Sequence, residues 1–202
     1  VLDRVFGLDR GFDSYQDEFD MGAALSQQGV LLTHSAEWVT KRAIDSVENS
    51  SPDKPLFLWV HYYDAHLPLR PITPHSEYFP DDPYLAEIHR VDENWNSVRE
   101  AMKERSGRPL VVLVVGDHGE SQGEHGEPTH GQFVYRSTMR VPWAMRGPGI
   151  EPKVEKSPVS IVDLTPTLLG VLGLEWVGPV DGVDVLSHEL SGRLLYGETF
   201  HP

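Results

Sequence analysis

The sequence predicts an α/β fold, in which strands and helices alternate along the chain. The clearest strand is the apolar run at residues 110–115, which contains four valines and ends in turn residues. A continuous β-branched run of this kind is typical of a strand buried on both faces inside a parallel sheet. A shorter apolar run at residues 56–60 predicts a second buried strand. Helical patterns lie before and after it, as expected for the α/β class.

The first half of the chain contains two predicted helices. Residues 1–20 place aromatic side chains among acids, with glycines at positions 7 and 11, and predict a structured loop. Residues 35–49 carry an apolar stripe with helical spacing. Residues 84–104 predict a longer helix, with apolar residues every three or four positions and a charged opposite face. The apolar positions of this longer helix are Leu85, Ile88, Val91, Trp95, Val98 and Met102.

A long loop separates the strand at residues 56–60 from the longer helix. Prolines interrupt residues 61–83 at five positions, 68, 71, 74, 80 and 83. Loops of this length inside a domain usually have a function or are flexible.

The second half continues the alternation of strands and helices. Residues 140–146 predict a third strand, which Gly147, Pro148 and Gly149 end. Thr165 followed by Pro166 is typical of a helix cap and first helical position, and predicts a helix that Gly173 ends. The tail from residue 178 predicts a loop. We find no repeat, and no internal domain boundary stands out in the sequence.

Composition excludes several classes of protein. The 202 residues are enough for one domain with a core, and the net charge of −14 argues against a nucleic-acid-binding protein. The absence of cysteine excludes disulfides and thiolate metal sites within this span. No apolar run approaches the length of a membrane span. The chain begins at Val1 in patterned sequence, so we expect a piece of a longer protein.

A carboxylate and an imidazole, Asp117 and His118, come directly after the valine-rich strand. Ligands of open α/β sheets bind beyond the carboxyl ends of the strands. We therefore expect these two side chains to bind a divalent cation, although such a pair can also simply cap a turn. Hard cations such as calcium or magnesium prefer oxygen ligands, and histidine widens the choice toward manganese or zinc. At least two further ligands must come from elsewhere.

Other histidines and arginines are candidates for substrate contact. His66 follows the strand at residues 56–60 and is a candidate general acid or anion contact, the alternative being a hydrogen-bonded loop histidine. His130 is expected to reach back toward Asp117, unless it is a surface residue. His125 is more easily interpreted as a solvated histidine than as a ligand. Arg140 and Arg146 flank the third strand and could bind an anionic substrate or form salt bridges.

Several segments, taken in order, resemble the sulfatases of the alkaline phosphatase superfamily. Residues 114–120 with 123–126 are similar to the family's carboxyl-terminal metal motif, and residues 57–68 to its strand and substrate-binding histidine. The other similar segments are residues 6–13, Tyr135, residues 140–142 and 146–149, residues 163–169 and residues 181–183. The resemblance implies an alkaline-phosphatase-like sandwich, with a central mostly parallel sheet flanked by helices, present here only in part.

The resemblance also implies roles for individual residues. Asp117 and His118 would be ligands of one divalent ion, calcium first, with manganese, magnesium or zinc as alternatives. His118 stands where many members carry asparagine. His66 would contact the sulfate or the leaving-group oxygen, and His130 stands where many members place a sulfate-binding lysine. Both would be catalytic and substrate-binding residues, and Arg140 would bind substrate.

Two parts of the family's site are absent from this sequence. The family's nucleophile is a formylglycine made within a Cys/Ser-x-Pro-x-Arg motif, and residues 50–54 match it only by chance because they end in lysine. The paired aspartates that complete the metal site are also missing. Residues 1–202 are therefore expected to be a partial sulfatase-like domain, inactive alone, whose amino-terminal part with the nucleophile precedes Val1.

Three functions remain open at this point. The first is hydrolysis of a small-molecule or carbohydrate sulfate ester, with a periplasmic or extracellular location suggested by the resemblance. The second is a phosphodiesterase, phosphonate hydrolase or phospho-group transferase of the same superfamily. Tyr62 stands four residues before His66, where the two-metal phosphatases carry an acid, which favours one metal. The third is a non-catalytic metal-binding fragment.

Overall fold

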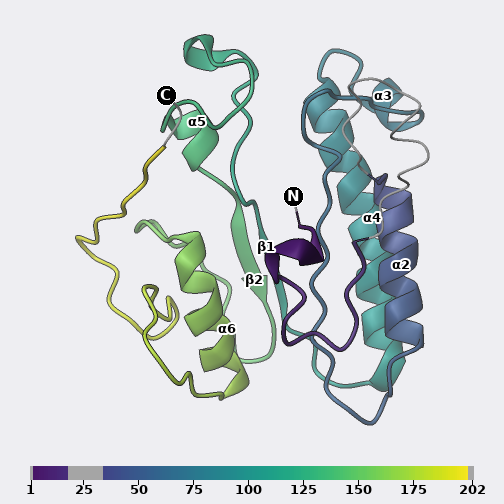
Figure 1. The fold of residues 1–202 in the computed structure, drawn as a ribbon, viewed down its shortest axis with the longest axis vertical. Helices are drawn as coiled ribbons and strands as arrows, with labels where there is room; N and C mark the ends of the chain where they lie inside the picture. The colour runs from purple at the N-terminus through teal and green to yellow at the C-terminus, as the bar shows by residue number, and fades with distance from the viewer. Residues whose placement is uncertain (1, 18–33, 200–202) are drawn as a thin grey trace. The chain divides into compact units, whose positions relative to one another are not determined.

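A computed structural model describes residues 2–17 and 34–199 (Figure 1). The chain divides into two compact units, Val1–Arg108 and Pro109–Pro202. The first unit is helical, and the second contains a small sheet, a helix and long loops.

Helices α2 (Ala36–Glu48) and α4 (Pro83–Ser106) form the centre of the first unit and lie side by side (Figure 1). The Ser35 hydroxyl accepts a hydrogen bond from the Trp38 N–H at the start of α2, and Asp82 caps α4 through the Leu85 N–H. Helix α4 ends at Gly107, whose positive φ of 61° suits glycine. Both helices confirm the sequence prediction.

The buried face of α4 differs from the predicted apolar face. Its buried residues are Ala86, Glu87, Arg90 and Val98, whereas Leu85 and Ile88 are exposed. The prediction of a charged solvent face is therefore wrong around Glu87 and Arg90. The physical reason is an ion network in which these two side chains find partners of opposite charge or backbone donors, which offsets the cost of their burial.

The apolar run at residues 56–60 is extended, but it is not a paired strand in the described part of the chain. Its side chains alternate in exposure, with Phe57 60% exposed and Trp59 53% exposed. Phe12 contacts both rings, with centroid distances of 5.8 and 6.3 Å. A strand is defined by hydrogen bonds to a neighbour, and no described segment supplies them here. The prediction of a buried strand is therefore not met.

The long loop at residues 61–83 contains one short helix. Helix α3 (His75–Tyr78) packs against α4 and buries His75. A 3-10 turn, η1 (Arg4–Phe6), lies near the start of the chain, where the sequence predicts a structured loop. Asp3 accepts a hydrogen bond from the Val5 N–H and begins this turn.

The sheet of the second unit has two described strands, β1 (Val112–Val115) and β2 (Trp143–Arg146). They are antiparallel, with Val112 opposite Arg146 and Val115 opposite Trp143. Both strands confirm the predicted positions. The prediction that the valine-rich strand lies among parallel neighbours, buried on both faces, is wrong for the described residues, because its partner runs antiparallel and Val114 stays exposed.

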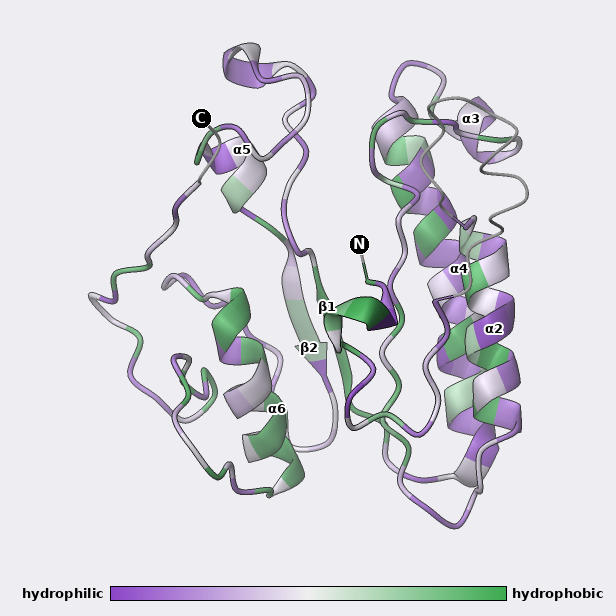
Figure 2. Cartoon of the chain, in the orientation of Figure 1, coloured by the Kyte–Doolittle hydropathy of each residue, from purple (hydrophilic) through white to green (hydrophobic). Residues whose placement is uncertain are grey.

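Short helical elements complete the second unit. They are η2 (Glu124–Gly126), α5 (Arg136–Met139), η3 (Ile161–Asp163) and α6 (Leu164–Leu172). Helix α6 is mostly hydrophobic (Figure 2) and ends at Gly173, as the sequence predicts. Buried Asp163, just before α6, accepts hydrogen bonds from the Ser160 and Val183 N–H groups. It also pairs with Arg193, which attaches the carboxyl-terminal tail to α6.

Burial raises the pKa of Asp163, but the Arg193 guanidinium and the two backbone donors outweigh it and hold that pKa below its ordinary value. The carboxylate is therefore ionised where it is buried.

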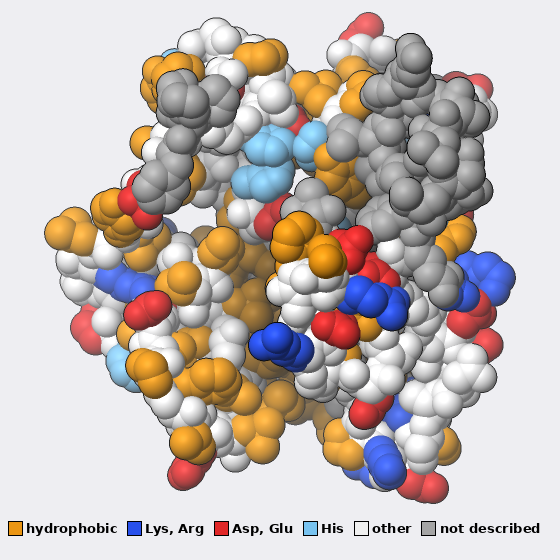
Figure 3. All heavy atoms as spheres, in the orientation of Figure 1, with side chains coloured by type: hydrophobic (Ala, Val, Ile, Leu, Met, Phe, Trp, Pro, Cys, Tyr) orange, Lys and Arg blue, Asp and Glu red, His pale blue; other side chains and the backbone are white. Residues whose placement is uncertain are grey.

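Many hydrophobic side chains reach the molecular surface (Figure 3). Those that are exposed include Phe57, Trp59, Val114, Phe133 and Trp176. Among the described residues, none of the helices has both the length and the apolar character of a membrane span.

Candidate functional site

Asp117 and His118 form the turn that follows β1. The Gly116 N–H donates to the Pro142 carbonyl, one residue beyond the last residue pair of β1 and β2. After Gly116 the chain leaves the sheet. Both side chains are exposed, and the His118 N–H donates to Asp117 Oδ1 over 3.0 Å. His118 Nδ1 lies 3.0 Å from the Gly119 carbonyl oxygen. A carbonyl can only accept, so Nδ1 carries the proton and the lone pair is on Nε2.

The donor atoms of this pair fit a shared cation. His118 Nε2 and Asp117 Oδ2 lie 3.6 Å apart. Two ligands at right angles on one calcium ion, each at its usual distance, are about 3.3–3.7 Å apart. The backbone carbonyl on the other ring nitrogen is the kind of contact that orients a metal-bound histidine. One oxygen and one nitrogen hold an ion only with further ligands, and they suit calcium, manganese or zinc.

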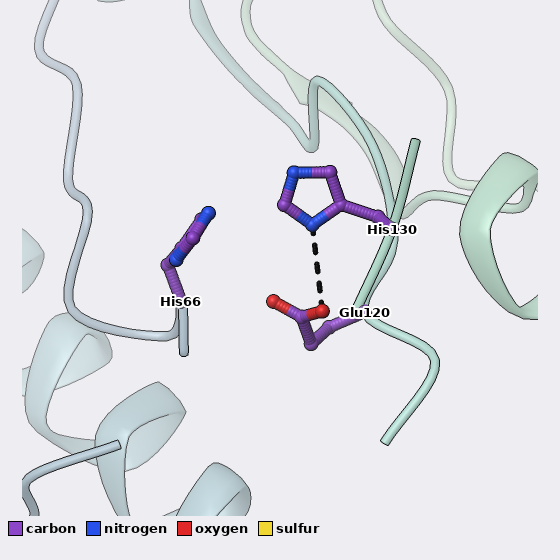
Figure 4. A group of neighbouring side chains, drawn as sticks. All are labelled: His66, Glu120 and His130. Carbon is purple, nitrogen blue, oxygen red and sulfur yellow. Dashed lines mark hydrogen bonds and ion pairs between the residues drawn. The ribbon is translucent and has the colours of Figure 1, made fainter. Parts of the chain in front are cut away.

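His130 lies beside His118 in the same unit. The two rings stack, with centroids 3.8 Å apart and planes inclined by 28°. His130 Nδ1 is 3.0 Å from Thr129 Oγ1 and 3.4 Å from Glu120 Oε1 (Figure 4). The Glu120 side chain is only 3% exposed, so its carboxylate is a fixed acceptor that orients the ring. The structure therefore brings His130 to the Asp117–His118 turn.

Close backbone packing determines the residue at position 119. The Gly119 N–H donates to the Thr138 carbonyl over 2.7 Å, and a Cβ at this position would collide with the Ser137 carbonyl oxygen. Only glycine allows the turn to approach α5 this closely.

Two buried side chains hold the rest of this loop. Ser121 Oγ contacts the carbonyl oxygens of Glu124 and Glu127, while its N–H donates to the Thr129 carbonyl. The fully buried Glu127 carboxylate accepts from the Gln132 N–H over 2.8 Å and the Phe133 N–H over 3.2 Å. Hydrogen bonds thus hold the loop both before and after His130 in the sequence.

The other candidates of this unit lie at its surface. His125 is exposed and stacks on Tyr135, with ring centroids 4.2 Å apart. Arg140, just after α5, and Arg146, at the end of β2, are exposed and make no ion pair within residues 2–17 and 34–199. Arg140 has the exposure that an anion contact requires.

His66 belongs to the first unit and is half-buried. Its Nδ1 lies 2.5 Å from the Leu67 carbonyl oxygen, so this nitrogen donates. The ring also stacks on Tyr63, with centroids 4.3 Å apart. Both contacts come from the same loop and fix the direction of the ring.

Helices α2 and α4 anchor the loop that carries His66. Asp64 Oδ1 accepts from the Ala36 N–H over 2.9 Å and lies 3.2 Å from Arg90 Nη1. The buried Glu87 carboxylate accepts from the Arg70 N–H over 3.0 Å. The loop is therefore held at two points, one before and one after His66.

Arg90 completes the network through α2. Its guanidinium makes two hydrogen bonds to the Glu37 carboxylate, at 2.8 and 2.5 Å, and these lower the pKa of Glu37 to about 2. Burial raises the pKa of Asp64, against the attraction of Arg90. The guanidinium thus neutralises carboxylates that are buried beside the loop.

Sequence reasoning missed Glu120, Glu127, Glu87 and Arg90. All four are charged residues with buried side chains. Charged residues are usually exposed, and no local pattern separates these from their neighbours. Their partners, Arg70 for Glu87 and Glu37 for Arg90, lie 17 and 53 residues away in the sequence.

The chain matches a known protein family over most of its length. The family model described as Sulfatase matches residues 3–174. An endo-4-O-sulfatase of Bacteroides thetaiotaomicron is 30% identical over 112 residues, which are 54% of this chain and 20% of that protein. A choline-sulfatase of Rhizobium meliloti is 35% identical over 107 residues, or 51% of this chain and 21% of that protein.

A relative outside the sulfatases also matches. A 2,3-bisphosphoglycerate-independent phosphoglycerate mutase of Acetivibrio thermocellus is 36% identical over 90 residues, 45% of this chain and 16% of that protein. The matched parts span about a fifth or less of the length of these curated relatives. The family match covers both units, and the chain belongs to the sulfatase family of the alkaline phosphatase superfamily, whose domain has an α/β fold.

Proposed function

We propose that this chain supplies part of the active site of a metal-dependent sulfuric ester hydrolase. The observation that carries the proposal is the Asp117–His118 turn at the end of β1, with Oδ2 and Nε2 3.6 Å apart. The sulfatase names of the relatives support the class of substrate. We also propose that β1 belongs to a larger, mostly parallel sheet, and that the formylglycine nucleophile and the remaining metal ligands come from residues before Val1.

Asp117 and His118 would be the metal ligands contributed by this chain, with calcium as the preferred ion. Bound there, a divalent cation supplies Lewis-acid polarisation of the ester and orients the nucleophile. The two side chains hold their donor atoms ready for this, because the His118 proton is committed to the Gly119 carbonyl. The carboxylate brings one negative charge, so part of the cation's charge remains for the anionic substrate.

His66 is proposed as the general acid. Its Nδ1 proton is held by the Leu67 carbonyl, so the proton that moves is one on Nε2 of the doubly protonated ring. As the proposed nucleophile bonds to sulfur and the bond between sulfur and the bridging oxygen breaks, this proton passes to that oxygen and the alcohol leaves neutral. The fixed ring direction favours transfer to one oxygen atom.

His130 and Arg140 are proposed to contact the sulfate. The Glu120 carboxylate orients the His130 ring, whose N–H groups can donate to the oxygens of an anion. Arg140 offers an exposed guanidinium, whose planar donors match oxyanions. In a chain with a net charge of −14, these groups and the ion would concentrate positive charge where the substrate binds.

Two other functions follow from different observations. The match to a phosphoglycerate mutase favours a phospho-group enzyme of the same superfamily. Tyr62, four residues before His66, argues against a two-metal phosphatase. The absence of a formylglycine motif in these 202 residues favours a non-catalytic metal-binding fragment. These three functions predict different results in one experiment.

The experiment measures hydrolysis of 4-nitrophenyl sulfate, 4-nitrophenyl phosphate and bis(4-nitrophenyl) phosphate by the complete protein, with bound metal counted by mass spectrometry. We expect the sulfate ester to have the highest kcat/KM. Asp117→Ala should remove the bound ion and lower this kcat/KM by at least about 1000-fold, because the site loses a charged ligand. Asp53→Ala, at an exposed turn position, is the matched control and should change neither value.

Faster hydrolysis of a phosphate ester would support the phospho-group enzymes instead. No hydrolysis of any of the three esters, with a bound ion that Asp117→Ala removes, would support the non-catalytic fragment. Full activity and unchanged metal content in Asp117→Ala would contradict the assignment of the site.

A further inference from the structure

A second group of ligating side chains lies in the first unit, outside the residues assigned above. His75 from α3 and His89 and Glu93 from α4 have their ligand atoms within 4.8 Å of one another. His75 Nδ1 is 3.0 Å from His89 Nδ1 and 3.8 Å from Glu93 Oε2. Two imidazoles and one carboxylate therefore converge where α3 packs against α4.

The packing of α3 on α4 fixes the two rings. The His75 side chain is only 7% exposed. The rings of Tyr78 and Phe79 approach His89 with centroid distances of 5.5 and 5.4 Å. His89 and Glu93 are four residues apart on α4, so both point from the same side of that helix. The cluster is thus made of two well-positioned nitrogens and one exposed carboxylate that can turn toward them.

We propose that His75, His89 and Glu93 bind a transition metal ion, with zinc as the best fit. Two nitrogens bound to one zinc ion at tetrahedral angles are about 3.3 Å apart, close to the spacing of the two Nδ1 atoms. Two histidines and a carboxylate form a donor set suited to zinc and its neighbours, whereas calcium and magnesium prefer oxygen ligands. The ion would join the four-residue helix α3 to α4 and leave one coordination position for water.

The competing interpretation is a plain hydrogen bond between the two rings. One Nδ1 would donate and the other accept, and the 3.0 Å distance suits such a bond. This arrangement places a proton between the nitrogens, whereas a metal ion replaces that proton. The two interpretations differ in the state of both Nδ1 atoms once zinc is added.

The test uses the complete protein with Asp117, His118 and His130 changed to alanine, which removes ligating groups at the β1 turn. Isothermal titration with zinc should give one ion per chain that depends on the cluster. Glu93→Gln and His89→Gln should each weaken this ion's binding at least tenfold. Glu104→Gln, an exposed change on the same helix, is the matched control and should leave the affinity unchanged.

Imidazole nitrogen NMR on the same samples gives a second readout. Zinc should shift the Nδ1 resonances of His75 and His89 together, and the shift should be absent in Glu93→Gln at the same zinc concentration. Glu93 is exposed, so this variant should keep the helix content of the parent chain in circular dichroism. Unchanged Nδ1 resonances, or zinc binding that is equal in the parent, His89→Gln and Glu93→Gln chains, would overturn the proposal.

Discussion

The loop at residues 61–70 is held by side chains of two helices, whereas the loop at residues 117–133 is held mainly by contacts within itself and with α5. In the first loop, Asp64 contacts the Ala36 N–H of α2 and Arg90 of α4, and the Arg70 N–H donates to Glu87 of α4. In the second loop, the Ser121 and Glu127 side chains bind backbone groups no more than six residues away. Each loop carries a histidine for which we propose a catalytic or substrate-binding role.

The directions of the two histidine rings therefore depend on different parts of the sequence. The direction of His66 depends on charged residues of a helix that begins 17 positions later, at Pro83. The direction of His130 depends on neighbours in the same loop. Changes in α4 should therefore disturb His66, and changes in the second loop should disturb His130, each with little effect on the other.

The largest expected effect comes from removing one of the two histidines. In the complete protein, His66→Ala should lower kcat/KM by about 100- to 10,000-fold for sulfate esters with alkyl leaving groups, because these need a proton. For 4-nitrophenyl sulfate the loss should be much smaller. Hydrolysis rates for a series of leaving groups of increasing pKa measure this difference. Equal losses across the series would assign His66 to binding rather than to proton transfer.

The next effect tests the anchor of the first loop. Arg90→Met leaves the Asp64 and Glu87 carboxylates buried without their cation, and should lower the free energy of unfolding by about 3 kcal/mol. Urea denaturation followed by helix circular dichroism measures it. Lys103→Met, which breaks an exposed pair with Glu100 on the same helix, should cost much less than Arg90→Met. Equal costs would mean that the network does not hold the loop.

The helices were predictable from sequence, but the faces that they bury were only partly so. The cap residues Ser35 and Asp82 and the terminal Gly107 act locally, so the start and end of α2 and α4 follow from nearby residues. Burial of Glu87 and Arg90 depends on partners that are distant in the sequence. Periodicity assigns charges to the solvent face, and it cannot show which charges will meet a partner.

In the candidate site too, local features were predictable and contacts between separate residues were not. The Asp117–His118 turn was predictable because the valine-rich strand β1 ends directly before it. The pairing of His130 with Glu120 was not, because it depends on how a glycine-rich loop folds back over ten residues. The prediction of a strand at residues 56–60 was not met for a related reason. The sequence pattern indicates an extended apolar segment, but it does not show whether a neighbouring segment pairs with it.

A smaller effect tests the second loop. Glu127→Ala leaves the Gln132 and Phe133 N–H groups without their acceptor and should lower the free energy of unfolding by about 2 kcal/mol. Glu127→Gln keeps an accepting oxygen at the same place and should cost less. Thermal melts followed by tryptophan fluorescence compare the two variants. If Gln and Ala cost the same, the charge and not the hydrogen bonds holds this loop.

The smallest effect concerns the pH dependence of stability that comes from Glu37, the half-exposed partner of Arg90. Arg90 lowers the pKa of Glu37 to about 2 from its ordinary 4.5, so the ionised carboxylate stabilises the folded chain. This contribution is complete above about pH 4.5 and is lost as the pH falls toward 2. Glu37→Gln should therefore make the acid-induced decrease in the free energy of unfolding smaller. The reduction should be less than about 1 kcal/mol, because Glu37 is half exposed.

Urea denaturation between pH 2 and 7 measures this contribution as the difference in unfolding free energy between the parent chain and Glu37→Gln. The difference should be largest at neutral pH and should shrink as the pH approaches 2. Glu48→Gln, an exposed change on the same helix, should give a difference near zero throughout. A difference for Glu37→Gln that stays constant over the whole range would mean that the α2 carboxylate contributes through packing and not through its charge. The anchor of the His66 loop would then depend on Asp64, Glu87 and Arg90 alone.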